Sequence, residues 1–219
     1  MGKSVCPRAY CDRPPPRTGF RAPLRQDGAV RATRTPPPTA PTLPRTVPEL
    51  PAAHGYRLRR WGPEDTGLLR EVAADPYVPL VTTVPAPYTE AGAAAYLESQ
   101  RRRTEIGTGY PFVIVDPTGR PVGDVGLWVG ELPLRGRATV GYWVAASARR
   151  RGAATAALGA VADWALDELA LPGLELHVEP WNTGSIRTAE RAGFRPTGLR
   201  TTHRSADGRP RDTRHYVRP

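Results

Sequence analysis

One segment rich in arginine and small residues could bind an anionic ligand through its backbone. The run Arg149-Arg150-Arg151 is followed by Gly152-Ala153-Ala154, where a helix with a periodic apolar face is predicted to begin. The first N–H groups of a helix lack partners within the helix, and the helix dipole adds positive character there. Small side chains let a ligand approach the backbone, and arginines pair with phosphates. The segment fits a pyrophosphate cradle, although tight packing beside a solvated turn would explain the same pattern.

A second segment has the same organisation further along the chain. Asn182-Thr183-Gly184-Ser185 follows an expected strand and opens a short helix over 185–192, which Gly193-Phe194 closes. Glycine commonly follows a helix because it adopts the left-handed backbone conformation without a steric penalty. Two strand–turn–helix segments in this order favour the ligand-binding interpretation of the first.

These segments need a framework that holds both helix starts beside their strands. Three consecutive β-rich stretches, 112–115, 122–129 and 138–145, predict an antiparallel meander. The apolar spacing over 152–169 predicts the clearest helix of the chain. The complete expected order from residue 55 is β-α-α-β-β-β-α-β-α-β-β, with further strands at 56–61, 174–178, from 194 and at 213–217, and helices opening at 63, 89 and 185. Asp207-Gly208 is a hairpin turn signal between the last two strands.

In this order the motifs resemble the GNAT acetyltransferases, and within them the ribosomal-protein N-terminal acetyltransferases of the RimJ/RimL type. Arg149-x-x-Gly152-x-Ala154 is similar to the family's acetyl-CoA motif, Arg/Gln-x-x-Gly-x-Gly/Ala. Gly141-Tyr142-Trp143-Val144 looks like the strand that precedes it, and Asn182-x-x-Ser185 with Gly193-Phe194 looks like the family's second half. The resemblance implies a mixed α/β fold over 55–219, with a mostly antiparallel central sheet flanked by helices.

The resemblance also implies acetyl-CoA as co-substrate and no metal. The activity it implies is transfer of acetyl to a primary amine, a protein N-terminus or a small amine, by direct attack in a ternary complex. Backbone N–H groups over 151–154 would hold the pyrophosphate, and the 143–144 backbone would hold the pantetheine and polarise the acetyl carbonyl. Asn182 would bind the cofactor arm. The complete set of residues implied in cofactor binding is Trp143, Val144, Arg149, Arg151, Gly152, Ala153, Ala154 and Asn182.

The general acid departs from the pattern of many GNAT enzymes. They carry a tyrosine five residues before the phenylalanine of the Gly-Phe pair, where this chain has Ala189. In the RimL type a serine is thought to serve instead, which points to Ser185. A helix N-cap is the alternative role for this serine. A second departure is Arg150, which stands where the subfamily usually has glycine.

The general base, which must take a proton from the amine, has three candidates. His203 lies in the segment where RimL-type enzymes carry a catalytic glutamate. Glu179 precedes the Asn182 loop and shares a strand face with Glu175 and His177. A bound water is the third candidate.

The composition limits which other classes of protein this chain could belong to. The net charge is +10, of which +6 comes from residues 1–50, a segment with 11 prolines that we expect to be a disordered tail. Both cysteines, Cys6 and Cys11, lie in that tail, which fits a reducing cytoplasm. No stretch of the sequence is apolar enough to predict a membrane span.

Two other classes compete with the enzyme. A non-catalytic acyl-CoA-binding module would suit the missing tyrosine and the absence of a clear base. A nucleic-acid-binding protein would suit the charge, but no nucleic-acid motif is present and most of the excess charge lies in the tail. We therefore expect acetyl-CoA and an amine as partners, without nucleic acid or membrane, and a monomer or homodimer.

Overall fold

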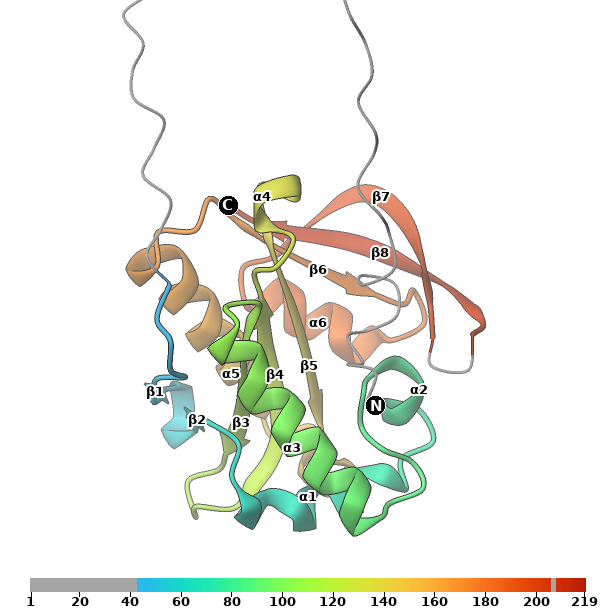
Figure 1. Ribbon diagram of the computed structural model, residues 1–219. Helices are drawn as coiled ribbons and strands as arrows, with labels where there is room; N and C mark the ends of the chain where they lie inside the picture. Colours follow the sequence, from blue (N-terminus) through green and yellow to red (C-terminus); the bar gives the residue numbers. More distant parts are fainter. Residues whose placement is uncertain (1–42, 206–207) are drawn as a thin grey trace, which may run out of the picture.

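The computed structural model describes residues 43–205 and 208–219 (Figure 1). Its strands are β1 Leu50–Pro51, β2 Arg57–Arg59, β3 Gly109–Val115, β4 Pro121–Trp128, β5 Ala138–Val144, β6 Leu174–Val178, β7 Arg195–Arg204 and β8 Pro210–Arg218. Its helices are α1 Thr66–Ala73, α2 Val78–Val81, α3 Glu90–Glu105, α4 Leu132–Arg135, α5 Ala153–Asp163 and α6 Thr183–Arg191.

The strands form one sheet of eight in the order β1-β2-β3-β4-β5-β6-β8-β7. Neighbours are antiparallel throughout except for β5 and β6, which are parallel. The predicted mixed α/β fold with a mostly antiparallel sheet is confirmed, as is the meander, which is β3-β4-β5. The short helices α2 and α4 and strand β1 were not expected. The helix predicted over 152–169 is α5, which continues in π-type turns over Trp164–Glu168.

Side chains alternate along the strands and divide the interior into two cores. On one face of the sheet α5 packs against β4 and β5, with Phe112 and Leu158 fully buried there. On the other face α3 packs against β3, and its core contains Leu69, Val113 and Trp143. Figure 1 shows α3 crossing the front of the meander. Both cores hold β5 rigidly between them, and β5 leads directly into the turn before α5.

The C-terminal part of the sheet is apolar on one face and polar on the other. Leu174, Leu176 and Val178 of β6 belong to the core that α5 covers. The residues between them, Glu175 and His177, point to the opposite face. On that face the core that α1–α3 cover includes side chains of β3 and β5 and does not extend to β6. This face of β6 and β8 therefore presents polar groups beside the helical layer.

The N-terminal boundary of the fold differs from the sequence-based expectation. Leu50 of β1 is only 8% exposed, and Leu43 and Val47 pack against the same core. The Tyr110 hydroxyl donates to the Pro44 carbonyl at 2.7 Å. The expected boundary near residue 50 thus falls inside the fold, because the apolar side chains before it pack against the core. The expected disorder of residues 1–42 and the turn residue Asp207 lie outside the described residues.

Among the described residues, no helix is both long and apolar enough to cross a membrane.

Candidate active site

The two parallel strands diverge and leave an opening in the sheet. β5 and β6 pair only at Ala138 with Leu174 and Thr139 with Glu175, at the start of both strands. Beyond that point the edge of β5 that faces β6 is not paired with it. An interrupted sheet edge offers unpaired backbone groups that a ligand can use.

Hydrogen-bond alternation decides which β5 residues face this opening. The Ala145 N–H donates to Val122 of β4 at 2.9 Å, whereas the Ala138 N–H donates to Gly173 on the other side at 3.0 Å. Even-numbered residues of β5 therefore point their backbone groups at the opening, and odd-numbered residues point at β4. The Val144 N–H therefore points into the opening, where its contact with pantetheine is expected. The backbone of Trp143 is turned toward Asp124 of β4, so Tyr142 takes its place on that edge.

The turn before α5 has the geometry of an anion cradle. Gly152 is the N-cap residue with φ 87°, and Arg150 has φ 63°. The first intrahelical bond runs from the Ala156 N–H to the Gly152 carbonyl at 3.0 Å. The preceding N–H groups, including those of Ala153 and Ala154, have no partner within the helix. A Cβ on Gly152 would meet no atom within 4 Å, so the space before the helix is open. The positive φ is a second reason for glycine here, besides close approach of a ligand.

The three arginines have different surroundings. The Arg149 guanidinium donates to Asp75 at 2.5 Å and to the Val144 carbonyl at 2.9 Å, so it fastens the turn to the segment after α1. Two of its donor groups are therefore engaged within the protein, and the expected pairing of Arg149 with the cofactor stays a prediction. Arg150 and Arg151 are exposed. The Arg151 carbonyl accepts from the Tyr56 hydroxyl at 3.1 Å, which anchors the backbone and leaves the side chain outside.

Ser185 faces a tyrosine across the opening. The Tyr142 hydroxyl lies 2.6 Å from Ser185 Oγ and 3.1 Å from the Ser185 carbonyl oxygen. Burial raises the pKa of Tyr142 to about 12, so its hydroxyl keeps its proton at neutral pH. Ala189, at the position where many relatives have tyrosine, is fully buried. Tyr142 from β5 thus brings a phenol to the site from a different element.

The alternative role of Ser185 as a helix N-cap is wrong. The cap is Asn182, whose side-chain oxygen accepts from the Ser185 N–H at 3.0 Å. Ser185 is therefore the third residue of α6, and its hydroxyl is directed at Tyr142. The Asn182 oxygen is engaged in the cap, and the Asn182 side chain also forms a hydrogen bond with Tyr77, so its role in cofactor binding stays a prediction.

A second group of side chains lies at the end of β6. Glu179 is only 6% exposed, and its carboxylate accepts from Arg211 at 3.1 Å and from the Trp181 indole N–H. The Tyr77 ring meets the Trp181 ring edge-on, with centroids 4.9 Å apart. Burial, followed by the Glu179 charge, raises the pKa of Tyr77 to about 12. The segment between α1 and α3 therefore meets the β6–α6 loop, where an acceptor could enter.

His203 lies in β7 with its Cα opposite that of Arg211. Its side chain is outside what the structure describes, so its role as general base stays a prediction.

Sequence reasoning missed one buried carboxyl group. Asp124 in β4 is 7% exposed and accepts a hydrogen bond from the Trp61 indole at 2.9 Å. Burial raises its pKa to about 7, which is the range that suits proton transfer at neutral pH. The signal was available, because Asp124 is the one ionisable residue in the otherwise apolar run Pro121–Trp128.

Comparison with known proteins assigns the fold and motifs to a family. A family model described as an acetyltransferase (GNAT) domain matches residues 56–195. The chain belongs to the GNAT acetyltransferase family. It is 32% identical over 113 residues to the probable N-acetyltransferase YjcK of Bacillus subtilis (strain 168), a match that covers 51% of this chain and 62% of YjcK. The chain thus matches less than two thirds of the length of that relative.

Two further proteins are similar over longer stretches. The uncharacterized N-acetyltransferase p20 of Bacillus licheniformis is 29% identical over 161 residues, which cover 69% of this chain and 85% of p20. The structure of Mycobacterium smegmatis RimJ in complex with CoA-disulfide superposes with a TM-score of 0.63 and 26% identity, over 78% of this chain and 86% of RimJ. The expected resemblance to the RimJ/RimL type is confirmed at the level of structural neighbours.

Proposed function

We propose that this protein is an acetyl-CoA-dependent N-acetyltransferase that transfers acetyl to a primary amine by direct attack in a ternary complex. The observation that carries the proposal is the continuous backbone path along β5 to α5. Unpaired β5 groups at Tyr142 and Val144 lead to the open, positive-φ turn at Gly152. Such a path offers donors to a pantetheine amide at one end and to a pyrophosphate at the other.

The Val144 N–H is the group we assign to the acetyl carbonyl. The Val144 carbonyl is occupied by Arg149 at 2.9 Å, whereas its N–H points into the opening. In the transition state the carbonyl oxygen becomes negative, so a donor fixed by the sheet stabilises it without reorganising. The amine nitrogen forms a bond to the carbonyl carbon, and the carbon–sulfur bond then breaks.

The departing thiolate needs a proton, and we assign this to the Tyr142–Ser185 hydroxyl pair. The 2.6 Å contact lets Tyr142 donate to Ser185 while the Ser185 proton is delivered to sulfur. Because the pKa of Tyr142 is about 12, the pair holds its protons at the pH of the reaction. Glu179, His203 and a bound water are the candidates for the base that takes the amine proton. None of these steps uses a metal.

For the acceptor we propose an amine bound beside Tyr77, Trp181 and Glu179. The carboxylate attracts an ammonium group, and the aromatic rings can pack on its chain. A protein N-terminus and a small amine both meet this description. The cytoplasmic location, and a monomer or homodimer, remain predictions from the sequence.

The test is thiol release from acetyl-CoA with a panel of N-terminal peptides and small amines, with product masses measured. Ser185→Ala and Tyr142→Phe should each lower kcat by about 10²–10⁴-fold, with little change in the KM for acetyl-CoA. Thr183→Ala, an exposed substitution at the start of the same helix, is the matched control. Tight acetyl-CoA binding without thiol release for any acceptor would instead support the non-catalytic module.

A further inference from the structure

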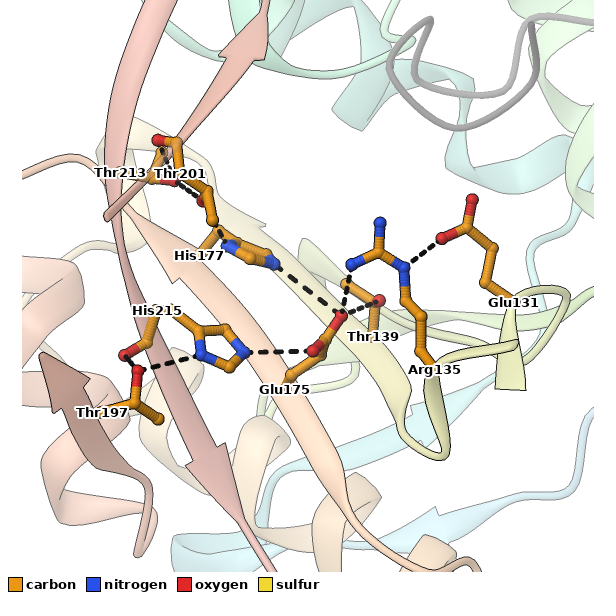
Figure 2. Close-up of polar contacts among 9 residues, drawn as sticks. All are labelled: Glu131, Arg135, Thr139, Glu175, His177, Thr197, Thr201, Thr213 and His215. Atoms are coloured by element: carbon orange, nitrogen blue, oxygen red, sulfur yellow. Dashed lines mark hydrogen bonds and ion pairs between the residues drawn. The ribbon is translucent and has the colours of Figure 1, made fainter. Parts of the chain in front are cut away.

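Three side chains that commonly bind divalent metals converge on the polar face of β6 and β8 (Figure 2). Glu175 and His177 alternate on β6, and His215 of β8 lies directly opposite His177. His215 Nε2 is 3.0 Å from Glu175 Oε2, and His177 Nε2 is 3.8 Å from Glu175 Oε1. One ligand atom from each residue lies within 4.8 Å of the other two.

The Thr197 hydroxyl holds the far ring nitrogen of His215. Thr197 Oγ1 lies 3.0 Å from His215 Nδ1 and 3.3 Å from the His215 carbonyl oxygen, and it accepts from the Leu199 N–H at 3.2 Å. These contacts direct the other ring nitrogen, Nε2, at the Glu175 carboxylate.

His177 has an equivalent support from the hairpin. Thr213 donates to the Thr201 carbonyl at 3.2 Å, and the two hydroxyl oxygens lie 2.8 Å apart. Thr201 Oγ1 also lies 3.0 Å from His177 Nδ1, as Thr197 does from the same nitrogen of His215. Figure 2 shows both imidazole rings directed at Glu175 from opposite strands. Proteins commonly orient a metal-binding histidine through an oxygen atom hydrogen-bonded to its other ring nitrogen, and in both histidines a threonine hydroxyl oxygen lies at that position.

The surroundings of Glu175 leave room for a cation. The imidazole centroids of His177 and His215 are 5.1 Å apart, and the Arg135 guanidinium lies 3.5 Å from Glu175. Arg135 also pairs with Glu131, so its guanidinium can turn toward solvent when a cation binds Glu175.

We propose that Glu175, His177 and His215 form a site for Zn²⁺ or a similar divalent cation, with water as the fourth ligand. Zinc bonds of about 2.0–2.2 Å in a tetrahedron put ligand atoms about 3.3–3.5 Å apart. That spacing lies between the two observed separations of 3.0 and 3.8 Å. Two imidazoles and one carboxylate are also a ligand set that zinc accepts.

The site is distinct from the cofactor path along β5 and does not depend on the proposed transfer reaction. A metal here would link β6 to β8. Glu179 directly follows β6, and Arg211 lies in β8. The sequence led us to expect no metal, and this cluster revises that expectation for the polar face of the sheet.

The experiment is calorimetric titration of the metal-free full chain with Zn²⁺, in several buffers and without a histidine tag. Cys6 and Cys11 are replaced by serine in every protein, so that the tail thiols cannot bind zinc. We expect one Zn²⁺ per chain with release of protons, and Co²⁺ should give the visible absorption of a low-coordinate site. His215→Gln and Glu175→Gln should weaken binding at least about tenfold, while the exposed His54→Asn should not.

A second variant covers the case in which ligand substitutions unfold the protein. Thr201→Val keeps all three ligands but removes the hydroxyl that orients His177, and should weaken zinc binding by about 10–100-fold. The absence of stoichiometric binding in the parent protein would overturn the proposal. Equal affinity in a folded His215→Gln protein would do the same, because the metal would then bind elsewhere.

Discussion

Asp124 is the carboxyl group whose ionisation should most affect the stability of the fold. It lies beneath the Trp61 indole, next to the buried rings of Tyr96 and Trp143. Burial raises its pKa from 3.8 to about 7. The native protein therefore binds more protons than the unfolded chain between these pH values. This stabilising contribution is complete below the unfolded pKa and is lost as the pH rises through 7.

The size of the effect follows from the shift. Each pKa unit corresponds to about 1.4 kcal/mol, so a shift of about three units costs at most about 4 kcal/mol above pH 8. Asp124→Asn retains an acceptor for Trp61 and cannot ionise. The variant should therefore gain free energy of unfolding relative to the parent as pH rises, by about 3 kcal/mol between pH 5 and pH 8.

Urea denaturation of both proteins across pH 5–9 measures this difference directly. The matched control is Asp116→Asn in an exposed turn, where a hydrogen bond from Thr118 lowers the pKa of the carboxyl group. That substitution should leave the pH dependence above pH 5 unchanged. Parallel stability curves for Asp124→Asn and the parent would refute the reasoning, because Asp124 would then ionise in the fold as it does in the unfolded chain.

Two further predictions concern the cofactor cradle and the N-terminal boundary. Gly152→Ala should weaken acetyl-CoA binding in calorimetry, because its Cβ occupies the open side of the cradle. It should also lower stability by about 1–2 kcal/mol, because φ is 87° there; unchanged affinity would argue against the assignment. A chain that starts at Leu43 should melt like the full-length protein, whereas one that starts at Pro51 loses the burial of Leu50, worth about 1.5–3 kcal/mol. Equal melting of the two shortened chains would show that β1 is dispensable.

The sequence predicted those elements whose signals are local. The start of α3 follows from Thr89, whose hydroxyl accepts from the Gly92 N–H, and the bounds of β6 agree with the strand predicted at 174–178. Gly152 was recognised at the start of α5 because small residues after a strand and before an apolar helix are visible within one short segment. Such signals depend on backbone preference and side-chain period, which each stretch of chain carries by itself.

The tertiary structure decided which residues of these elements face each other. The choice of Tyr142 over Trp143 at the opening depends on how β5 pairs with β4, and Arg149 is bound by Asp75, 74 residues away. His215 reaches Glu175 only because β8 inserts between β6 and β7. Strand order and register are set by the free energy of packing the whole sheet, which no single segment contains. The sequence therefore determined the elements and the family motif, and the pairing of distant strands determined the chemistry at their edges.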